Sequence, residues 1–486
     1  MKLLFLLFTI LFCVSSSADD RPNVIFILID DLGYNGISCF GNELVDTPNI
    51  DSFAKKGMKF TDAYAMPQCS PTRAAFLTGQ YCARTKMTSV VKEFVNMPKA
   101  AVIDHDPVRV LPMSVYTIGK MFRDAGYVSA TSGKWHVDLN ESENKQKLGK
   151  EKYFDSYGFS MFPKGETEGD PKRVMAHTTG LIEFIRQNKD KPFFAYLAHN
   201  TVHTALEAPK EYVDKYVAKG FKKYPSVPHS AEYLAMIDYL DYSVGLITVE
   251  LDKQGLTDNT MIVFMSDNGG HYKIWGKHGD LRRGKGAIHE GGIRVPMIVQ
   301  WPKAVKAGKV CDIPVHIVDW YATFLDLVNG KKPQDHILDG ESLLPLLKEE
   351  AELQREAIMV HTPNYVANYH KTPATMVRKG DYKLIHFYGD QIDDFNSKKL
   401  IPGEAYALYN LRKDIGEKYN LIESHPEKFQ ELKKEMARLL NETGAYIPSQ
   451  NLNFDLADWD FKIKSEADKA KKAEKLKKKK AKVVKP

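Results

Sequence analysis

The sequence contains little cysteine, with five residues in a chain of 486. Cys13 lies in the apolar N-terminal segment, which leaves Cys39, Cys69, Cys82 and Cys311 in the rest of the chain. Four cysteines cannot form the dense disulfide framework of small secreted domains, and we expect one disulfide at most. The sequence also has no HExxH motif and no paired CxxC motifs, so the common types of zinc site are not expected.

An apolar run long enough to span a membrane is missing as well. Residues 1–18 combine Lys2 with a mainly apolar run from Leu3 to Val14 and then small polar residues, which is the layout of a secretory signal peptide. The run is too short for an easy membrane span, although an uncleaved anchor is the alternative. We therefore expect cleavage near Ala18, a mature chain without a transmembrane span, and a secreted or periplasmic location.

An excess of positive charge is missing outside the C-terminal end. The formal net charge is +6, but residues 461–486 contain twelve Lys and three acidic residues, a net of +9, so the other residues together carry −3. Such a Lys-rich end is typical of a solvated, disordered tail, with a tether to an anionic polymer as the alternative. Because the rest of the chain has no basic excess, nucleic acid is not an expected partner.

The hydrophobic content of 43% provides material for a sizeable core, and its pattern alternates between strands and helices. Continuous apolar runs, typical of strands buried on both faces of a parallel sheet, occur at 24–29, 127–132, 193–198, 261–265 and 294–301. Helical patterns occur at 47–56, 118–124, 179–187, 234–247 and 315–328. The alternation predicts a large α/β domain at 19–350.

The pattern changes after residue 350. Residues 376–385 indicate two short antiparallel strands that turn at Gly380-Asp381, and residues 408–411 favour a further strand. Residues 426–440 have the apolar spacing of an amphipathic helix. We expect a small C-terminal α+β subdomain at 351–460 that packs on the main sheet.

Acidic and amide side chains follow two of the expected strands. Asp30 and Asp31 follow the first strand, and Asp267 and Asn268 follow the strand at 261–265. Ligand sites in doubly wound sheets lie at the carboxyl ends of the strands, and oxygen ligands there fit Ca²⁺ or Mg²⁺. The alternatives are a helix cap for the first pair and a plain turn for the second pair.

Basic side chains lie in other loops. Lys134 and His136 follow one expected strand, where both side chains can leave the same face, and His203 follows another. Lys285 lies in Arg282-Arg-Gly-Lys-Gly286, a glycine-flanked basic loop suited to an oxyanion. Taken singly, each residue also has an ordinary explanation: an exposed Lys beside a packed His, a capping His, and a solvated turn.

The most specific segment is Cys69-Ser70-Pro71-Thr72-Arg73, which is followed by Leu77-Thr78-Gly79. It resembles the signature of the sulfatases that carry a formylglycine, Cys-x-Pro-x-Arg and then Thr-Gly. The resemblance extends over residues 21–445 and includes Gly133-Lys-Trp-His136 and Ser266-Asp-Asn-Gly269. One departure is Thr204-Ala205 after His203, where members of the family often have Pro nearby.

The resemblance implies an alkaline-phosphatase-like fold, in which a large, mostly parallel sheet is sandwiched by helices and a smaller C-terminal α+β subdomain follows. It implies a sulfuric ester hydrolase that binds a divalent cation, usually Ca²⁺ with Mg²⁺ as the alternative. Its nucleophile is a formylglycine, which a formylglycine-generating enzyme would form from Cys69. The family's metal ligands correspond to Asp30, Asp31, Asp267 and Asn268, with Cys69 completing the site. The family's other catalytic residues correspond to Arg73 and His136, which hold the formylglycine hydrate, and to Lys134, His203 and Lys285, which bind the sulfate.

The chemistry of sulfate ester cleavage agrees with these implied roles. One hydroxyl of the aldehyde hydrate would attack sulfur, while the cation and the basic side chains offset the charge that develops on the sulfate oxygens. His203, with Lys285 as a second candidate, would protonate the leaving oxygen. His136 would then deprotonate the second hydroxyl, so that the aldehyde forms again and sulfate is expelled. Serine or unmodified cysteine lacks that second hydroxyl.

The expected location favours a sulfated carbohydrate as the substrate, with specificity in loops such as 93–107, 164–175 and 363–373. Two other functions stay open. One is a phosphate or phosphonate ester hydrolase of the same architecture, against which the Gly133-Lys-Trp-His136 pattern argues. The other is an inactive relative that binds sulfated glycans, against which the presence of the nucleophile and of every acidic ligand argues.

Overall fold

The computed structural model describes residues 21–91, 100–103, 105–165, 168–223, 229–271, 279–365, 372–389, 391–392, 400–401 and 403–454. The expected signal peptide at 1–18 and the expected Lys-rich tail at 461–486 lie outside the described residues. The same holds for parts of the three loops in which we expect specificity. None of the helices in these described ranges has the length and apolar character needed to cross a membrane.

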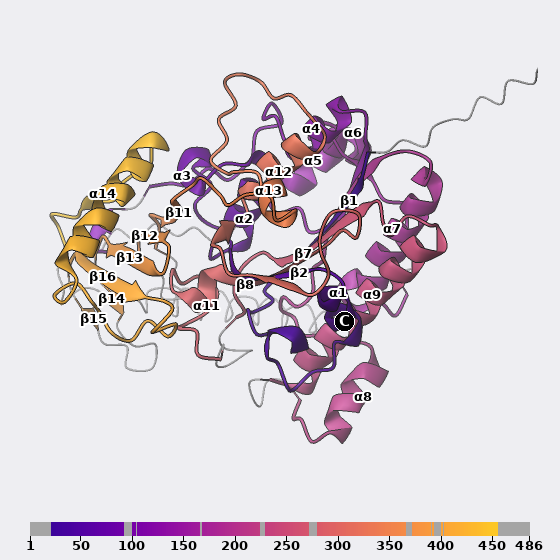
Figure 1. The fold of residues 1–486 in the computed structure, drawn as a ribbon, viewed down its shortest axis with the longest axis horizontal. Helices are drawn as coiled ribbons and strands as arrows, with labels where there is room; N and C mark the ends of the chain where they lie inside the picture. Colours follow the sequence, from indigo (N-terminus) through magenta and orange to yellow (C-terminus); the bar gives the residue numbers. More distant parts are fainter. Residues whose placement is uncertain are drawn as a thin grey trace, which may run out of the picture.

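A nine-stranded sheet forms the centre of the molecule (Figure 1). Its order is β10-β2-β8-β7-β1-β6-β4-β5, with β9 paired to β2. The strands are β1 (Asn23–Ile29), β2 (Met58–Tyr64), β4 (Val128–Gly133), β5 (Ser160–Met161), β6 (Phe193–Ala198), β7 (Thr260–Ser266), β8 (Arg294–Gln300), β9 (Lys309–Cys311) and β10 (Val315–His316). All pairings are parallel except those of β8, which runs antiparallel to β2 and β7. The predicted large, mostly parallel sheet is confirmed.

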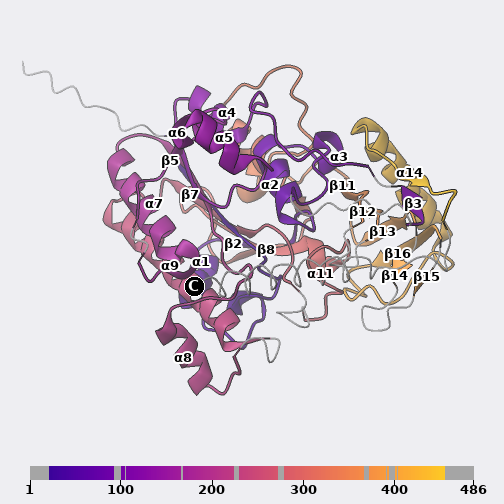
Figure 2. The same cartoon turned by 180° about the vertical axis from the view of Figure 1, so that it is seen from behind.

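Helices cover both faces of this sheet (Figures 1 and 2). Alternate residues of β1 enter two separate cores: Val24, Phe26 and Leu28 face one, and Ile25, Ile27 and Ile29 face the other. The first core includes residues of α2 (Cys69–Thr78), α4 (Ile118–Asp124), α12 (Asp319–Leu327) and α13 (Leu344–Leu347). The second includes residues of α1 (Pro48–Lys55), α7 (Val174–Asn188), α8 (Lys210–Ala218) and α9 (Ala231–Lys253). The remaining helices in these ranges are η1 (Ser38–Phe40), α3 (Cys82–Thr85), α5 (Glu141–Leu148), α6 (Lys150–Asp155), η2 (Pro171–Arg173) and α11 (Glu290–Ile293).

A separate antiparallel sheet follows in the C-terminal part, at the left of Figure 1. It contains β11 (Ala357–Thr362), β12 (Ala374–Lys379), β13 (Tyr382–Phe387) and β16 (Ala405–Asn410), and α14 (Pro426–Glu442) packs on it. Lys379 pairs with Tyr382, so the predicted turn at Gly380-Asp381 is confirmed. Two small ribbons, β14 (Gln391–Ile392) with β15 (Leu400–Ile401) and β3 (Val102–Ile103) with β17 (Ser449–Gln450), complete the described strands.

Buried ion pairs join the small sheet to the main one. Lys383 of β13 lies 2.9 Å from Glu290 of α11 and 2.8 Å from Glu417, and all three side chains are fully buried. The backbone N–H of Glu290 donates to Glu417 Oε2 at 2.8 Å. Arg378 of β12 pairs in the same way with Asp62 of β2 at 2.5 Å. The C-terminal sheet is therefore held to the main sheet by ion pairs that are buried or nearly so.

Two helix predictions are wrong at their beginnings. Residues 315–316, which we expected to begin a helix, form β10, and the helix starts only at Asp319, whose Oδ2 accepts the N–H of His316. The helix expected at 179–187 already begins at Val174, because the carboxylate of Asp170 accepts the N–H groups of its first turn. Cys39, Cys69, Cys82 and Cys311 are all free, so no disulfide joins these four cysteines.

Candidate active site

The candidate site begins at the carboxyl ends of the two central strands. Ile29 of β1 pairs with Ser266 of β7, so the residues that follow each strand come together. The N–H of Asp267 donates to Ile29 O at 2.9 Å, and the N–H of Asp31 donates to Asp267 Oδ1 at 3.1 Å. Asp31 adopts a left-handed backbone, with a φ of 66°. Both carboxylates are therefore held side by side in the interior.

Helix α2 brings Cys69 to this edge of the sheet. Cys69 is the first residue of the helix, and all ten residues of α2 are buried. Thr72 Oγ1 donates to Asp267 O at 2.6 Å, which fixes the N-terminal turn of the helix against the end of β7. Cys69 Sγ lies 3.2 Å from His136 Nδ1, and it lies within 4.8 Å of carboxylate oxygens of Asp30 and Asp267.

Arg73 connects three parts of the site from one turn further along α2. Its Nη2 donates to Asp267 Oδ2 at 2.8 Å, and its Nη1 donates to Lys134 O at 2.6 Å. The guanidinium is fully buried, and an Arg with two such partners has little freedom to move. Arg73 thus holds the end of β7, the end of β4 and the helix that begins at Cys69 in one arrangement.

The end of β4 requires glycine to bring Lys134 into place. Gly133 has a φ of 103°, and a Cβ at this position would lie 1.8 Å from Ala198 O of β6. The N–H of Lys134 donates to the same oxygen at 2.8 Å. From this corner the Lys134 side chain reaches Asp30, with Nζ 2.6 Å from Oδ2. His136 follows with another left-handed backbone, at a φ of 57°.

Two further basic side chains surround Asp31. Lys285 Nζ lies 2.7 Å from Asp31 Oδ1 and 2.9 Å from its Oδ2, in a fully enclosed position. His203 Nε2 lies 3.8 Å from Asp31 Oδ2 and is the most accessible of the basic groups, with 34% of its side chain exposed. The site is therefore closed on the side of Lys285 and open on the side of His203.

The concentration of charge changes the protonation equilibria of the site. Burial raises the pKa of Asp30, but the charges of Lys134 and His203 outweigh it and hold that pKa well below its usual range. Burial and the charge of Asp30 raise the pKa of Asp267, with Arg73 acting in the opposite direction. Burial and the neighbouring Lys134 lower the pKa of His136 to about 3, so this imidazole is neutral near pH 7. The site therefore combines an ionised carboxylate at Asp30 with a neutral imidazole at His136.

The acidic residues fit a hard divalent cation. Asp30 Oδ1 and Asn268 Oδ1 are buried, and neither accepts a hydrogen bond from the described residues. An unsatisfied buried oxygen is costly, and a cation would satisfy both. Asn268 is oriented by its Nδ2, which donates to Asp31 Oδ1 at 2.8 Å. Carboxylate and amide oxygens in this number are the ligands that Ca²⁺ and Mg²⁺ prefer.

All ten predicted site residues lie at this one edge of the sheet, although their roles stay predictions. They are Asp30, Asp31, Cys69, Arg73, Lys134, His136, His203, Asp267, Asn268 and Lys285. Sequence analysis missed the anchoring role of Thr72, for which its place inside the Cys69-to-Arg73 segment was the only available signal.

Comparison with known proteins agrees with this geometry. Residues 22–330 match a family model described as Sulfatase, and residues 276–445 match one described as N-sulphoglucosamine sulphohydrolase, C-terminal. A sulfatase of Formosa agariphila is 28% identical over 84% of this chain and 86% of its own length. Human steryl-sulfatase is 27% identical over 80% of each chain, and rat N-acetylgalactosamine-6-sulfatase is 28% identical over 69% of this chain and 67% of its own.

Solved structures extend the likeness to the fold. The crystal structure of Ps i-CgsB in complex with k-i-k-neocarrahexaose is 26% identical, with a TM-score of 0.69 over 89% of this chain and 94% of that one. A phosphonate monoester hydrolase of Agrobacterium radiobacter reaches a TM-score of 0.63 at 19% identity, over 87% of this chain and 96% of that one. At that identity the second likeness concerns the fold alone.

Proposed function

Because the chain belongs to the sulfatase family and is therefore a sulfuric ester hydrolase, we propose that it hydrolyses a sulfated carbohydrate with Cys69, oxidised to formylglycine, as the nucleophile. The observation that carries the proposal is the position of Cys69. It lies at the buried start of α2, within 4.8 Å of two carboxylates and 3.2 Å from a neutral imidazole. A structural cysteine would have no need of these neighbours.

A divalent cation, Ca²⁺ or Mg²⁺, completes the proposed site. Asp30, Asp31, Asp267 and Asn268 would hold it, because their oxygens converge and two of these oxygens, Asp30 Oδ1 and Asn268 Oδ1, accept no hydrogen bond from the described residues. When bound, the cation would supply positive charge beside the sulfate and favour ionisation of the nucleophile. Arg73 keeps Asp267 oriented for this purpose through its 2.8 Å ion pair.

Cys69 and His136 would act together in turnover. A formylglycine hydrate at position 69 has two hydroxyls, one to attack sulfur and one whose deprotonation expels the sulfate. His136 Nδ1 lies 3.2 Å from the Sγ that these oxygens would replace, and burial lowers the pKa of His136 to about 3. A neutral imidazole at that distance can accept the proton of the second hydroxyl.

The basic residues would bind the sulfate and the leaving group. Lys134 and Lys285, each within 3 Å of a carboxylate on opposite sides of the acidic pair, would face sulfate oxygens as charge develops on them. His203 would protonate the leaving oxygen, with Lys285 as the second candidate. The partial exposure of His203 supports this assignment, because the leaving sugar must lie on the open side of the site.

A sulfated carbohydrate is the proposed substrate class. The relatives include an N-acetylgalactosamine-6-sulfatase, and Ps i-CgsB has been crystallised with a neocarrahexaose. Sulfated extracellular carbohydrates also agree with a secreted or periplasmic location. A formylglycine-generating enzyme would be the maturation partner, and no transmembrane span is expected in the mature chain.

Mass spectrometry of the tryptic peptide from Phe60 to Arg73 tests the proposal. We expect the mass of an aldehyde at position 69 when the protein is produced with a formylglycine-generating enzyme, and hydrolysis of a sulfated saccharide by that sample. Cys69→Ala supplies the control, because it folds without a convertible thiol. Unmodified Cys69, under conditions that convert a reference sulfatase, would refute the mechanism. A higher rate on phosphate or phosphonate esters than on any sulfate ester would refute the substrate class.

A further inference from the structure

A sharp backbone corner lies between residue 170 and the start of α7. Lys172 and Arg173 both have left-handed backbones, with φ of 59° and 58°. Asp170 holds the corner in place: its carboxylate accepts the N–H groups of Met175 at 3.1 Å and Ala176 at 2.7 Å. Tyr239 of α9 donates to the same carboxylate at 3.2 Å. Two consecutive strained residues persist only where the surroundings enforce them, and such positions concentrate at functional sites.

The Lys172 side chain at this corner carries a charge that has no partner among the described residues. Lys172 is partly buried, and it forms no hydrogen bond and no ion pair with the residues that the structure describes. Burial lowers the pKa of Lys172, while Glu207 and Asp30 raise it and Lys134 lowers it further. A partly desolvated ammonium without a counter-ion is poorly satisfied by the protein alone.

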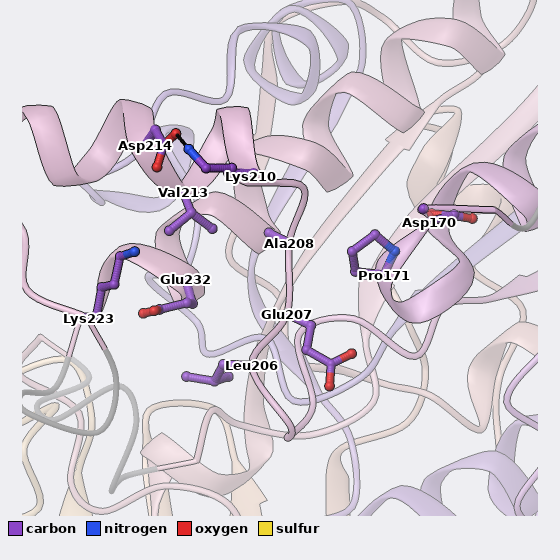
Figure 3. A pocket seen from close by; sticks show the side chains of 11 residues that line it. Asp170, Pro171, Leu206, Glu207, Ala208, Lys210, Val213, Asp214, Lys223 and Glu232 are labelled. Atoms are coloured by element: carbon purple, nitrogen blue, oxygen red, sulfur yellow. Dashed lines mark hydrogen bonds and ion pairs between the residues drawn. The ribbon is translucent and has the colours of Figure 1, made fainter.

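A pocket of about 650 Å³ is lined in part by the residues that directly precede Lys172 (Figure 3). Gly169, Asp170 and Pro171 form one wall, and Leu206, Glu207 and Ala208 form another. The second wall follows His203 by three residues, so one loop serves both the catalytic centre and the pocket. The remaining lining comes from α8, from the start of α9 and from Lys223, and Figure 3 shows the ion pair of Lys210 with Asp214 at its edge.

We infer that Lys172 is a specificity-determining residue that binds a second anionic group of the substrate, a sulfate or a carboxylate, while the saccharide extends past His203 into this pocket. The inference rests on the proposed function, because it assumes that a sulfate ester is bound at the catalytic centre. It narrows the substrate class to saccharides that carry at least two anionic groups.

The charges around the corner favour an anion of the substrate over other occupants. Lys210 in the pocket already pairs with Asp214, so its charge is compensated within the protein. Within the part of the chain that the structure describes, Lys172 has no such partner, and the exposed Glu207 acts on it through its charge without a hydrogen bond or ion pair. An anionic group that contacts Lys172 would gain a charge-assisted hydrogen bond in a partly desolvated position. Glu207 would weaken this contact by like-charge repulsion, so its neutralisation should strengthen binding.

Binding to an inactive background tests the inference independently of turnover. In Cys69→Ala protein, isothermal titration calorimetry compares a disulfated saccharide, a saccharide with one sulfate and one uronate, and a matched monosulfated saccharide. Lys172→Met should weaken binding of at least one dianionic saccharide about tenfold and leave the monosulfated one unchanged. Lys172→Arg should restore most of the loss, Glu207→Gln should tighten dianionic binding, and Lys253→Met, at the exposed end of α9, should change nothing. Equal effects of Lys172→Met on all three ligands, or no effect, would overturn the inference.

Kinetics separate a failure of this inference from a failure of the proposed function. Wild-type protein that carries the formylglycine at position 69 should have a higher kcat/KM on a dianionic saccharide than on the monosulfated one. Lys172→Met should remove this difference by raising the KM for the dianionic saccharide, while its hydrolysis of 4-nitrophenyl sulfate stays the same. Modified protein that hydrolyses none of these esters would refute the proposed function. Normal hydrolysis without a preference for the dianionic saccharide would overturn the role of Lys172 alone.

Discussion

Lys383 offers a sharp test of how the two sheets are held together. Replacement by Met preserves most of the side-chain volume but leaves Glu290 and Glu417 buried together without their shared cation. Removing one partner of a buried ion pair typically lowers the free energy of unfolding by about 3–5 kcal/mol. Tyr64 still donates to Glu290 at 2.7 Å and Arg294 still lies 3.4 Å away, so Glu290 keeps favourable neighbours. Glu417 is therefore the group that must take up a proton in the variant.

The loss of stability caused by Lys383→Met depends on the pH, because Glu417 must be protonated in the folded variant. Burial already raises the pKa of Glu417 above the usual 4.5, whereas the pKa of Glu290 is lowered to about 2, because the charges of Lys383 and Arg294 outweigh its burial. Neutralising a carboxyl costs about 1.4 kcal/mol for each pH unit above its unfolded-state pKa. The cost for Lys383→Met is then about 1.4 kcal/mol near pH 5.5 and about 5 kcal/mol near pH 8. Because the pKa of Glu417 is higher in the folded variant than in the unfolded chain, the loss of stability is smallest at low pH and grows as the pH rises.

Urea unfolding of the variant and the wild-type protein at the two pH values measures this difference. Lys379→Met in the neighbouring strand is the matched control, because its ion pairs with Glu356 and Glu431 are partly exposed and should contribute less than about 1 kcal/mol. A Lys383→Met/Glu417→Gln double variant should regain most of the stability at high pH, because the amide needs no proton. A loss of stability that is equal at both pH values would refute the reasoning.

Three other features give predictions of smaller scope. His199 is fully buried, which lowers its pKa from 6.5 to about 3, so the unfolded chain takes up the proton first and stability should fall as the pH drops below about 6.5. In thermal unfolding, His199→Phe should reduce the dependence of stability on pH by up to about 1.4 kcal/mol per pH unit, and an unchanged dependence would contradict this account. Chelation of divalent ions should abolish hydrolysis and Ca²⁺ or Mg²⁺ should restore it, with Asp31→Asn requiring a higher ion concentration; activity that survives exhaustive chelation would exclude the proposed cation. Gly133→Ala should lower stability and activity together, because its Cβ would lie 1.8 Å from Ala198 O. The control Gly255→Ala, also at positive φ but with open space around the added carbon, should lower the free energy of unfolding by only about 1 kcal/mol in a melting experiment.

The central strands were predictable because they are buried on both faces. The apolar run at 24–29 corresponds to β1 at Asn23–Ile29, and the run at 261–265 corresponds to β7 at Thr260–Ser266. The antiparallel direction of β8 was not predictable, since direction depends on how the chain returns to the sheet and not on local pattern. The two-residue strand β10 was missed for a related reason: within the apolar segment 315–328, a short buried strand and a buried helix have the same hydrophobicity.

The site was predictable where its residues follow strands or belong to a compact signature. Asp30 and Asp267 come together because adjacent parallel strands end at the same edge. The ion pair between Lys134 and Asp30 could not be read from the sequence, because it depends on the close approach of β4 and β6 at Gly133. Specificity was expected in the loop 164–175, but Lys172 could not be singled out within it, because its position depends on a left-handed corner that a Lys rarely adopts and that the contacts of Asp170 hold in place.

The complete burial of α2 has a consequence for the biogenesis of the protein. No residue of this helix is accessible in the folded chain, and Arg73 and Thr72 fasten it from within. If Cys69 is oxidised to formylglycine as proposed, the maturation enzyme could bind the peptide around Cys69 only while that segment is still unfolded. The fraction of molecules that carry the formylglycine would then depend on the relative rates of oxidation and folding during synthesis. A molecule that folds before Cys69 is oxidised would be stably folded but would remain catalytically inactive.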